Sequence, residues 1–169
     1  SVGKLTGFEH AMKSGAGYAE IILADGLAVG AYMAVNACGE IYDQDKILAG
    51  ALADDDRTII SSHRLMLEGY ERNMGGNTSI GCIITNADLT KTECRMVSTM
   101  AHDGLARSIR PVHTSMDGDT LFTMASGEVK TTIDTVGYLA EEAVRLAVLD
   151  AAASAEGMGG RPAYRDIIK

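Results

Sequence analysis

Residues 75–84 have the sequence Gly75-Gly76-Asn77-Thr78-Ser79-Ile80-Gly81-Cys82-Ile83-Ile84, in which a polar, glycine-containing approach runs directly into an apolar stretch. Glycine tolerates backbone angles that other residues avoid, and a short apolar run bounded by turn residues is typical of a buried strand. We therefore predict a loop that ends at Asn77 and a strand from Thr78 to about Thr85.

This junction has the composition of a self-cleavage site. A hydroxyl residue at the first position of a buried strand can attack its own upstream carbonyl group when the peptide between them is strained. Cleavage between Asn77 and Thr78 would give Thr78 a free α-amine, whose reference pKa of roughly 7.7–8.0 suits a general base for the adjacent hydroxyl. The alternative is an ordinary loop between a helix and a strand, for which Gly-Gly-Asn is also a common signal.

A second segment with chemical potential is Asp117-Gly118-Asp119, which precedes the strand-like run 121–125. On a turn, both carboxylates can point into one cavity, and paired carboxylates suit proton transfer. A calcium loop is excluded, because Asp119 is followed by Thr-Leu-Phe rather than by further oxygen ligands and a glutamate at the twelfth loop position. A solvated turn that opens a strand is the alternative interpretation.

The rest of the chain predicts an α+β layered fold in which helices cover sheet faces. The apolar stretches 17–23 and 27–37 are joined by Asp25-Gly26 and predict a hairpin. Thr90 and Glu93 form a capping box, so we expect a helix that ends at Arg110, since Pro111 cannot continue it. Further expectations are a strand at 120–125, a second helix from about 132 to 155, a solvated loop at 43–56, and a mobile helix or loop at 58–73.

Taken together, several segments resemble one known family, that of the L-aminopeptidase/D-esterases and nylon-oligomer (6-aminohexanoate-oligomer) hydrolases, which are self-processing enzymes of the N-terminal-nucleophile type. The resemblance runs through nearly the whole chain and is carried by residues 2–5, 7–15, 29–37, 77–81, 100–107 and 111–120. It implies a four-layer α/β/β/α sandwich of the DmpA and ornithine-acetyltransferase kind, with the nucleophile strand in the centre of its sheet.

Members of this family are about twice as long, and the part without a counterpart here is their N-terminal half. We therefore expect this chain to supply roughly the C-terminal half of the sandwich. A further segment should supply the other half, since half a sandwich alone would leave apolar strand faces exposed. On this basis residues 1–77 are the C-terminal part of an α subunit, and residues 78–169 are a β subunit that starts at the nucleophile. Together they are part of one domain.

The resemblance also implies roles for single residues. Thr78 matches the nucleophile, and Asn77 matches the residue whose carbonyl is attacked during autocleavage. Asp117 and Asp119 match an Asp-Gly-Asp motif near the nucleophile, where they would orient the Thr78 amine and share a proton with it.

Lys4 and Asn36 match polar residues that lie beside the threonine in the relatives. A lysine there could lower the pKa of the nucleophile, and the Asn36 amide could donate to an oxyanion, an interaction typically worth about 3 kcal/mol. A surface lysine and a satisfied amide at a strand end are the alternatives. His113, near the acidic pair, could tune it or could support its own loop by a hydrogen bond.

Composition excludes several functional classes. The 169 residues suit one domain with a real core, and the net charge of −8 argues against nucleic acid or an anionic membrane as partner. No apolar run is long enough to span a bilayer. Cys38, Cys82 and Cys94 are widely spaced, which is typical of reduced core thiols in a cytoplasmic protein. No His/Cys spacing fits a zinc site, and no cofactor is expected.

The predicted function is therefore hydrolysis of peptide or short amide (oligoamide) bonds through an acyl-enzyme on Thr78. The substrate could be an amino acid amide, a β-peptide or an oligoamide. The expected partners are the missing N-terminal half and further copies in a homo-oligomer of αβ units. Two alternatives stay open, an acyl transferase of the ornithine-acetyltransferase kind and a truncated fragment without catalytic activity.

Overall fold

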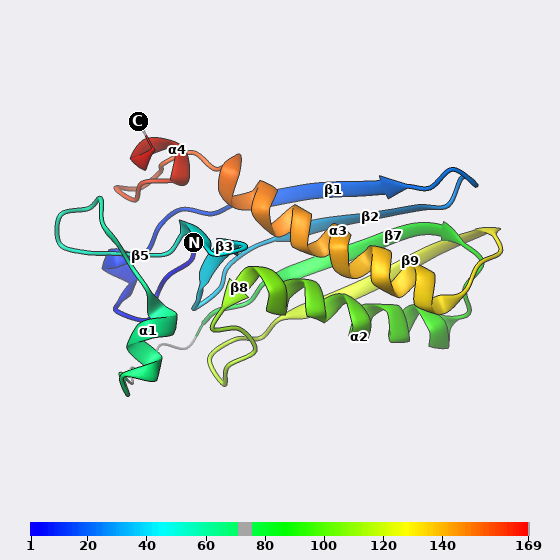
Figure 1. The fold of residues 1–169 in the computed structure, drawn as a ribbon, viewed down its shortest axis with the longest axis horizontal. Helices are drawn as coiled ribbons and strands as arrows, with labels where there is room; N and C mark the ends of the chain where they lie inside the picture. The colour runs from blue at the N-terminus through cyan, green and yellow to red at the C-terminus, as the bar shows by residue number, and fades with distance from the viewer. Residues whose placement is uncertain (71–75, 169) are drawn as a thin grey trace.

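A computed structural model describes residues 1–70 and 76–168, and its largest element is a four-stranded sheet. Strands β1 (Ala16–Ile22), β2 (Ala28–Ala34), β7 (Ile80–Ala87) and β9 (Thr120–Val129) lie in the order β1-β2-β7-β9 (Figure 1). Pairing is antiparallel up to β7, and β7 and β9 are parallel. The predicted hairpin is confirmed. The strand predicted to start at Thr78 begins two residues later, at Ile80, and is interior, as expected.

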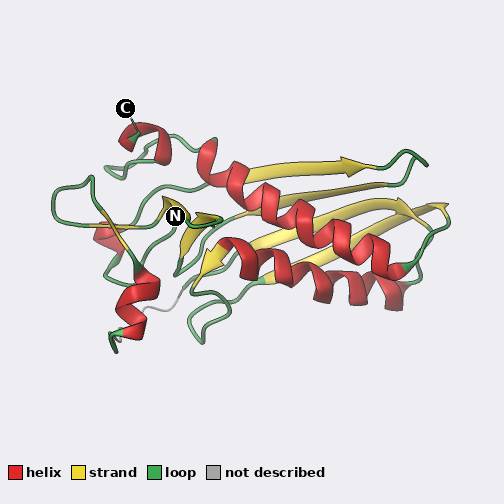
Figure 2. Ribbon diagram, viewed as in Figure 1, coloured by secondary structure: helices red, strands yellow, loops and turns green. Residues whose placement is uncertain are grey.

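Two long helices, α2 (Lys91–Ser108) and α3 (Ile133–Ala153), cover one face of this sheet (Figure 2). The capping box at α2 is confirmed, because the Thr90 side chain accepts from the Glu93 backbone and the Glu93 carboxylate accepts from Thr90 N. The predicted end at Arg110 is two residues too late. Ile109 and Arg110 instead pair with Ile41 and Glu40 as strand β8 (Ile109–Arg110), which buries Ile109 completely.

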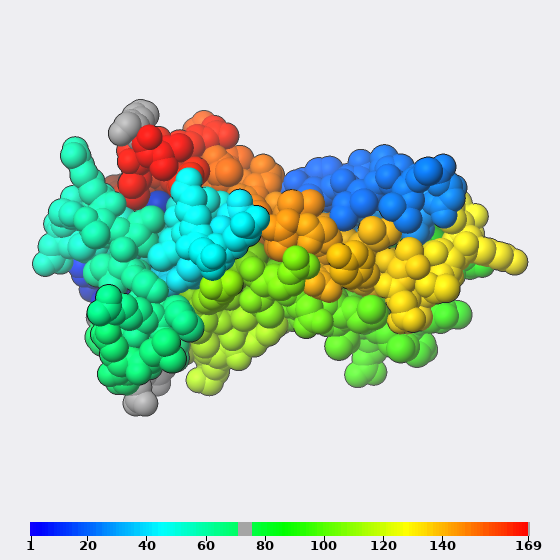
Figure 3. Space-filling model, viewed as in Figure 1, coloured from blue at the N-terminus to red at the C-terminus, as the bar shows by residue number. Residues whose placement is uncertain are grey.

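The helices approach the sheet and each other closely because small residues face the contacts. A Cβ atom on Gly17 of β1 would lie 2.1 Å from the Ala147 carbonyl oxygen of α3. A Cβ atom on Gly104 of α2 would lie 2.3 Å from the Glu141 carbonyl oxygen of α3. The space-filling view shows the resulting helical layer over the sheet (Figure 3).

Short strands form the end of the molecule where the N-terminus lies (Figure 1). One sheet has the order β4-β3-β8, with β3 (Glu40–Asp43) and β4 (Lys46–Ala49), and β5 (Ala51–Leu52) pairs with β6 (Ile59–Ile60). The remaining elements are the 3-10 helix Phe8–His10, α1 (Ser62–Leu67) and α4 (Tyr164–Ile167). None of the helices among the described residues has the length and apolar character needed to cross a membrane.

The expected solvated loop at 43–56 is wrong for its middle part. Leu48, Ala49, Ala51 and Leu52 are buried in β4 and β5, whereas Asp54 to Asp56 are exposed in the turn that follows. The apolar run at residues 47–53 lies between charged residues and is too short to show the alternation typical of a strand. In the segment 58–73, the structure has β6 and the short helix α1, and residues 71–73 lie outside the described ranges.

The face of the main sheet opposite the helices carries large, exposed apolar side chains. Successive strand residues point to opposite faces, so one set packs under the helices and the other is left open. The open set consists of Tyr18, Tyr32, Ile80, Ile84, Phe122 and Met124, which are between 49% and 62% exposed. We call this set the open face. The α+β fold class is confirmed, with this chain forming one helix layer and one sheet layer.

Candidate active site

The predicted cleavage junction lies at the N-terminal ends of the parallel strands β7 and β9. Asn77 forms a parallel bridge with Asp117, which extends the β7–β9 ladder upstream of Ile80. Asn77 and Ser79 are buried, whereas Thr78 is exposed. Strand alternation therefore places the Thr78 side chain on the same side as Ile80, at the edge of the open face. Gly75, the first residue of the junction, lies outside the described residues.

Both the carbonyl group and the N–H group of the peptide bond between Asn77 and Thr78 form hydrogen bonds. The Asn77 carbonyl oxygen accepts from the Gly118 N–H at 2.8 Å and from the Thr78 hydroxyl, whose Oγ1 is 2.6 Å away. The Thr78 N–H donates to the Asn36 carbonyl oxygen at 2.8 Å. The hydroxyl of Thr78 is thus beside the carbonyl group that it would attack in self-cleavage.

The two predicted carboxylates accept hydrogen bonds from backbone N–H groups and one hydroxyl group near Thr78. Asp117 Oδ1 accepts from the Cys38 N–H at 3.1 Å, and Asp117 Oδ2 accepts from the Thr114 hydroxyl at 2.7 Å. Asp119 Oδ1 accepts from the Ser79 N–H at 2.8 Å. The structure therefore brings both carboxylates to the junction, and their hydrogen bonds fix the chain on either side of it.

The second carboxylate oxygen of Asp119, Oδ2, does not take part in these hydrogen bonds. Asp119 Oδ2 is buried and, among the described residues, has no hydrogen-bond partner; His113 Nε2 lies 3.9 Å from it. His113 Nε2 in turn lies 3.0 Å from Nδ1 of His102 on α2. Burial lowers the pKa of His102, and the neighbouring His113 lowers it further. A line of titratable groups thus runs from α2 to the Ser79 backbone.

Lys4 and Asn36 contact each other beside the junction. Lys4 Nζ donates to Asn36 Oδ1 at 2.8 Å, and Asn36 Nδ2 donates to the Gly76 carbonyl oxygen at 3.3 Å. Lys4 is only 4% exposed, so the alternative of a surface lysine is wrong. The pKa of Lys4 is lowered overall, because the effect of burial exceeds the opposing effects of the nearby Cys38 and Asp117.

Sequence reasoning missed two members of this cluster. Cys38 was placed in the core without a role, yet its backbone N–H binds Asp117, and its thiol, whose pKa burial raises to about 11, lies in the same buried group as Lys4. Cys82 and Cys94, also expected in the core, are only partly buried. No motif marks His102, whose contact with His113 joins α2 to the loop that precedes β9.

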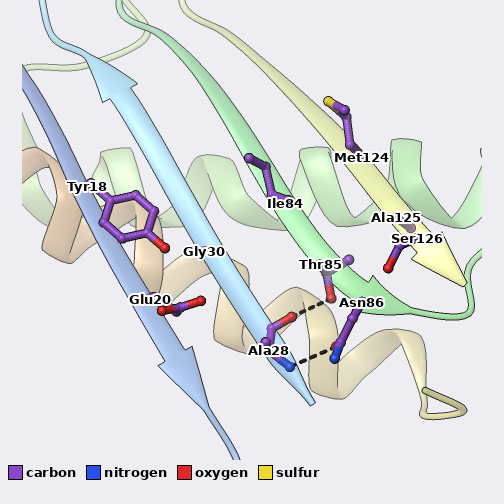
Figure 4. Close-up of a pocket in the computed structure, with 10 residues that line it drawn as sticks. All are labelled: Tyr18, Glu20, Ala28, Gly30, Ile84, Thr85, Asn86, Met124, Ala125 and Ser126. Atoms are coloured by element: carbon purple, nitrogen blue, oxygen red, sulfur yellow. Dashed lines mark hydrogen bonds between the residues drawn. The ribbon is translucent and has the colours of Figure 1, made fainter. Parts of the chain in front are cut away.

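A pocket on the open face lies away from this site. It is lined by residues of all four strands, among them Tyr18, Glu20, Ile84 and Met124, and it is bordered by the Ala28–Asn86 hydrogen bond (Figure 4). Ile84 and Asn86 lie on β7, six and eight residues after Thr78, which corresponds to roughly 20–26 Å along a strand. Because this pocket is remote from Thr78, we take the cluster of polar groups around the Asn77–Thr78 junction as the candidate site.

The chain matches known proteins along almost its entire length. The model of peptidase family S58 matches residues 2–165. An uncharacterized aminopeptidase of Mycobacterium leprae is 34% identical over 174 residues, which cover 90% of this chain and 48% of that protein. A 6-aminohexanoate-oligomer endohydrolase of Paenarthrobacter ureafaciens is 41% identical over 54 residues, which cover 32% of this chain and 15% of that enzyme.

The fold matches as well. The L-aminopeptidase D-Ala-esterase/amidase of Ochrobactrum anthropi, described as a variant among the Ntn hydrolase fold, superimposes with a TM-score of 0.56 at 18% identity. This match covers 90% of the present chain and 44% of that enzyme. The expected resemblance is confirmed, and the chain spans about half the length of the aminopeptidases that it matches.

Proposed function

This chain belongs to peptidase family S58, and from that premise we propose that it is the nucleophile-bearing part of a self-processing amide hydrolase. Thr78 is the nucleophile, and cleavage before it divides the chain into residues 1–77 and 78–169. The observation that carries the proposal is the 2.6 Å contact of the Thr78 hydroxyl with the Asn77 carbonyl oxygen, at the start of an interior strand.

Turnover would use the new N-terminus of Thr78. The freed α-amine takes the proton from Oγ1 as Oγ1 attacks the carbonyl carbon of a substrate amide, and the same proton is passed to the leaving amine. Water then hydrolyses the ester. The Asn36 carbonyl oxygen, which accepts from Thr78 N in the uncut chain, is placed to keep this amine oriented. Lys4, held by Asn36 Oδ1, adds positive charge near the developing oxyanion.

The substrate site is completed by a segment that this chain does not contain. Thr78 opens at the edge of the open face, which is bare and apolar. The chain also spans only about half of its relatives. We infer that an N-terminal segment packs a second sheet on the open face and supplies most of the pocket walls, and that such αβ units form a homo-oligomer. The names of the relatives favour N-terminal residues or oligoamides as substrates.

The deciding experiment is the denatured mass of the purified protein, produced with its N-terminal segment, for the parent and the Thr78→Ala and Thr78→Ser variants. We expect fragments that end at Asn77 and begin at Thr78 in the parent. The serine variant keeps the hydroxyl and should also be cut, whereas the alanine variant should stay intact.

An intact parent would overturn the proposal, and so would a cut alanine variant. Hydrolysis of amino acid amides, β-peptides and 6-aminohexanoate oligomers by the cut protein then identifies the substrate class. Transfer of the acyl group to an amine in excess of hydrolysis would instead indicate an acyl transferase.

A further inference from the structure

We propose that the backbone N–H of Gly118 is the oxyanion donor of the self-cleavage step, and that residue 118 is glycine so that the hydroxyl of Thr78 can approach. This inference rests on the proposed function, because it concerns the same peptide bond. It assigns a catalytic contact to the residue between the two aspartates rather than to either carboxylate.

The geometry at the Asn77 carbonyl group supports this assignment. When Thr78 Oγ1 attacks the carbonyl carbon of Asn77, negative charge develops on the Asn77 oxygen. The Gly118 N–H already donates to that oxygen at 2.8 Å, which is within the 2.7–3.1 Å range expected of an oxyanion donor. The Asn36 side-chain amide, which the family resemblance implies as a donor to an oxyanion, donates in the uncut chain to the Gly76 carbonyl oxygen, one residue upstream of the group attacked in self-cleavage.

The donor is rigidly held. Gly118 lies between Asp117 and Asp119, whose carboxylates are bound by the backbone N–H groups of Cys38 and Ser79. The next ladder bond, from Thr120 N to the Ser79 carbonyl oxygen at 3.0 Å, continues the same strand pairing. A donor fixed in this way needs no rearrangement as charge develops, which is the condition for strong electrostatic stabilisation.

The absence of a side chain at residue 118 has a steric reason. Gly118 does not have a positive φ, so its backbone conformation does not demand glycine. A Cβ atom at this position would, however, lie 2.8 Å from Thr78 Oγ1, closer than real Cβ contacts come. Alanine at 118 would therefore keep the N–H donor and push the nucleophile away.

Self-cleavage needs water as its only further reagent. Oγ1 forms a bond to the Asn77 carbonyl carbon, the Asn77–Thr78 C–N bond breaks, and the hydroxyl proton moves to the departing Thr78 nitrogen. This N-to-O shift leaves an ester between Asn77 and Thr78. One water molecule then hydrolyses the ester, giving the Asn77 carboxylate and the free Thr78 hydroxyl and amine.

The test compares two backbone substitutions in the protein assembled with its N-terminal segment. A synthetic segment that begins at Cys94 is ligated to the upstream chain, with glycolic acid replacing Gly118 or with the α-hydroxy analogue replacing Thr120. Each change turns one ladder N–H into an ester oxygen, but only the first removes the donor to the Asn77 carbonyl. Fragment formation is followed by mass after folding is started. We expect the 118 ester to cleave roughly 100-fold more slowly than the 120 ester.

Equal cleavage rates for the two esters would overturn the inference while leaving self-cleavage standing. Absence of cleavage in the all-amide protein would overturn the proposed function and this inference with it. The expressed variant Gly118→Ala adds an independent arm. We expect it to fold and to cleave slowly, with Gly15→Ala, whose added Cβ would meet its nearest atom at an ordinary 3.6 Å, cleaving at the parent rate. An alanine variant at 118 that folds and cleaves at the parent rate would contradict the steric part.

Discussion

The two aspartates that flank Gly118 differ in what their side chains contact, although the sequence presents them as a symmetric pair. Asp117 accepts from Cys38 N and from both the N–H and the hydroxyl of Thr114. Asp119 accepts from Ser79 N through one oxygen, and its other oxygen faces His113 at 3.9 Å. Both oxygens of Asp117 thus have hydrogen-bond partners, whereas Asp119 Oδ2 has none among the described residues, and we expect the proton-sharing role to fall on Asp119.

This difference predicts opposite outcomes for two matched substitutions. Asp117→Asn replaces one acceptor oxygen by a donor that faces other donors, which should cost about 1.5–3 kcal/mol of unfolding free energy. Asp119→Asn keeps the Ser79 contact, so stability should hold while turnover falls by about 10²-fold or more from loss of the proton-sharing group. Urea unfolding and hydrolysis assays measure the two effects, with Asp45→Asn on an exposed turn as the control. Equal loss of stability in both variants would show that Asp119 is structural too.

At this scale, sequence reasoning could name Thr78, Asn77, Asp117 and Asp119, because short motifs and the family resemblance mark them. It could not find the contacts of Cys38 or the His102–His113 pair. These side chains come from separate elements, and only the packing of α2 against β9 and its preceding loop brings the histidines to 3.0 Å. For Asn36, the family resemblance predicts a position beside the junction. It does not predict that the Asn36 amide contacts the carbonyl group of Gly76.

Among the elements, helix α1 is held by a buried carboxylate. Glu40 on β3 is fully buried and accepts from the N–H groups of Ser62 and His63 at the start of α1. It also accepts from the hydroxyl of Tyr42 at 2.6 Å. A carboxylate at a helix N-terminus is favoured by the unpaired N–H groups there. This network ties α1, which precedes the Asn77–Thr78 junction, to the sheet that contains β8.

The Tyr42 contact makes a pH-dependent prediction for Tyr42→Phe. At pH 7 the variant should be less stable by about 1.5–3 kcal/mol, since Glu40 loses a donor in a charge-assisted hydrogen bond. Burial, and secondly the bond to Glu40, raise the pKa of Tyr42 to about 12. Because this pKa lies above the unfolded value of roughly 10, the Tyr42 contribution is complete below pH 10 and is lost as the pH rises through 12.

The difference in unfolding free energy between parent and Tyr42→Phe should therefore narrow from pH 10 to pH 12. Other groups that titrate in this range are shared by both proteins and cancel in the comparison. Tyr138→Phe, at an exposed tyrosine on α3, should show no difference at any pH. A constant gap between parent and Tyr42→Phe across this range would argue against the buried Tyr42–Glu40 bond.

The long elements could be predicted from sequence, because each carries a strong local signal. The hairpin has its turn pair, α2 has its capping box, and α3 has a wide alanine-rich face. The short strands β4, β5 and β6 could not, since segments of two to four residues show no periodicity, although their pairing partners lie close in the chain. Helix α2 ends early because Ile109 pairs with Ile41 of β3, which is distant in the sequence.

The decisive feature of the main sheet is that it is apolar on both faces, while the described residues cover only one of them. On β7, Ile83 is buried under the helices, and Ile80 and Ile84 are about half exposed on the open face. Strands that are apolar on both faces are typical of sheets buried on both sides. An exposed apolar surface of this kind marks an interaction site, and the occupant that we propose for it is the N-terminal segment, since the chain spans about half the length of its relatives.

Methionine oxidation can test this assignment, because two exposed methionines lie in different places. Met124 is 62% exposed on the open face, and Met158 is 70% exposed in the turn between α3 and α4. Exposure controls the oxidation of methionine to its sulfoxide. In residues 1–169 alone, hydrogen peroxide should oxidise both side chains at similar rates. With the N-terminal segment present, Met124 should become protected while Met158 stays reactive, as measured by peptide mass. Equal reactivity of both methionines in the complex would place the N-terminal segment elsewhere and leave the open face to another partner.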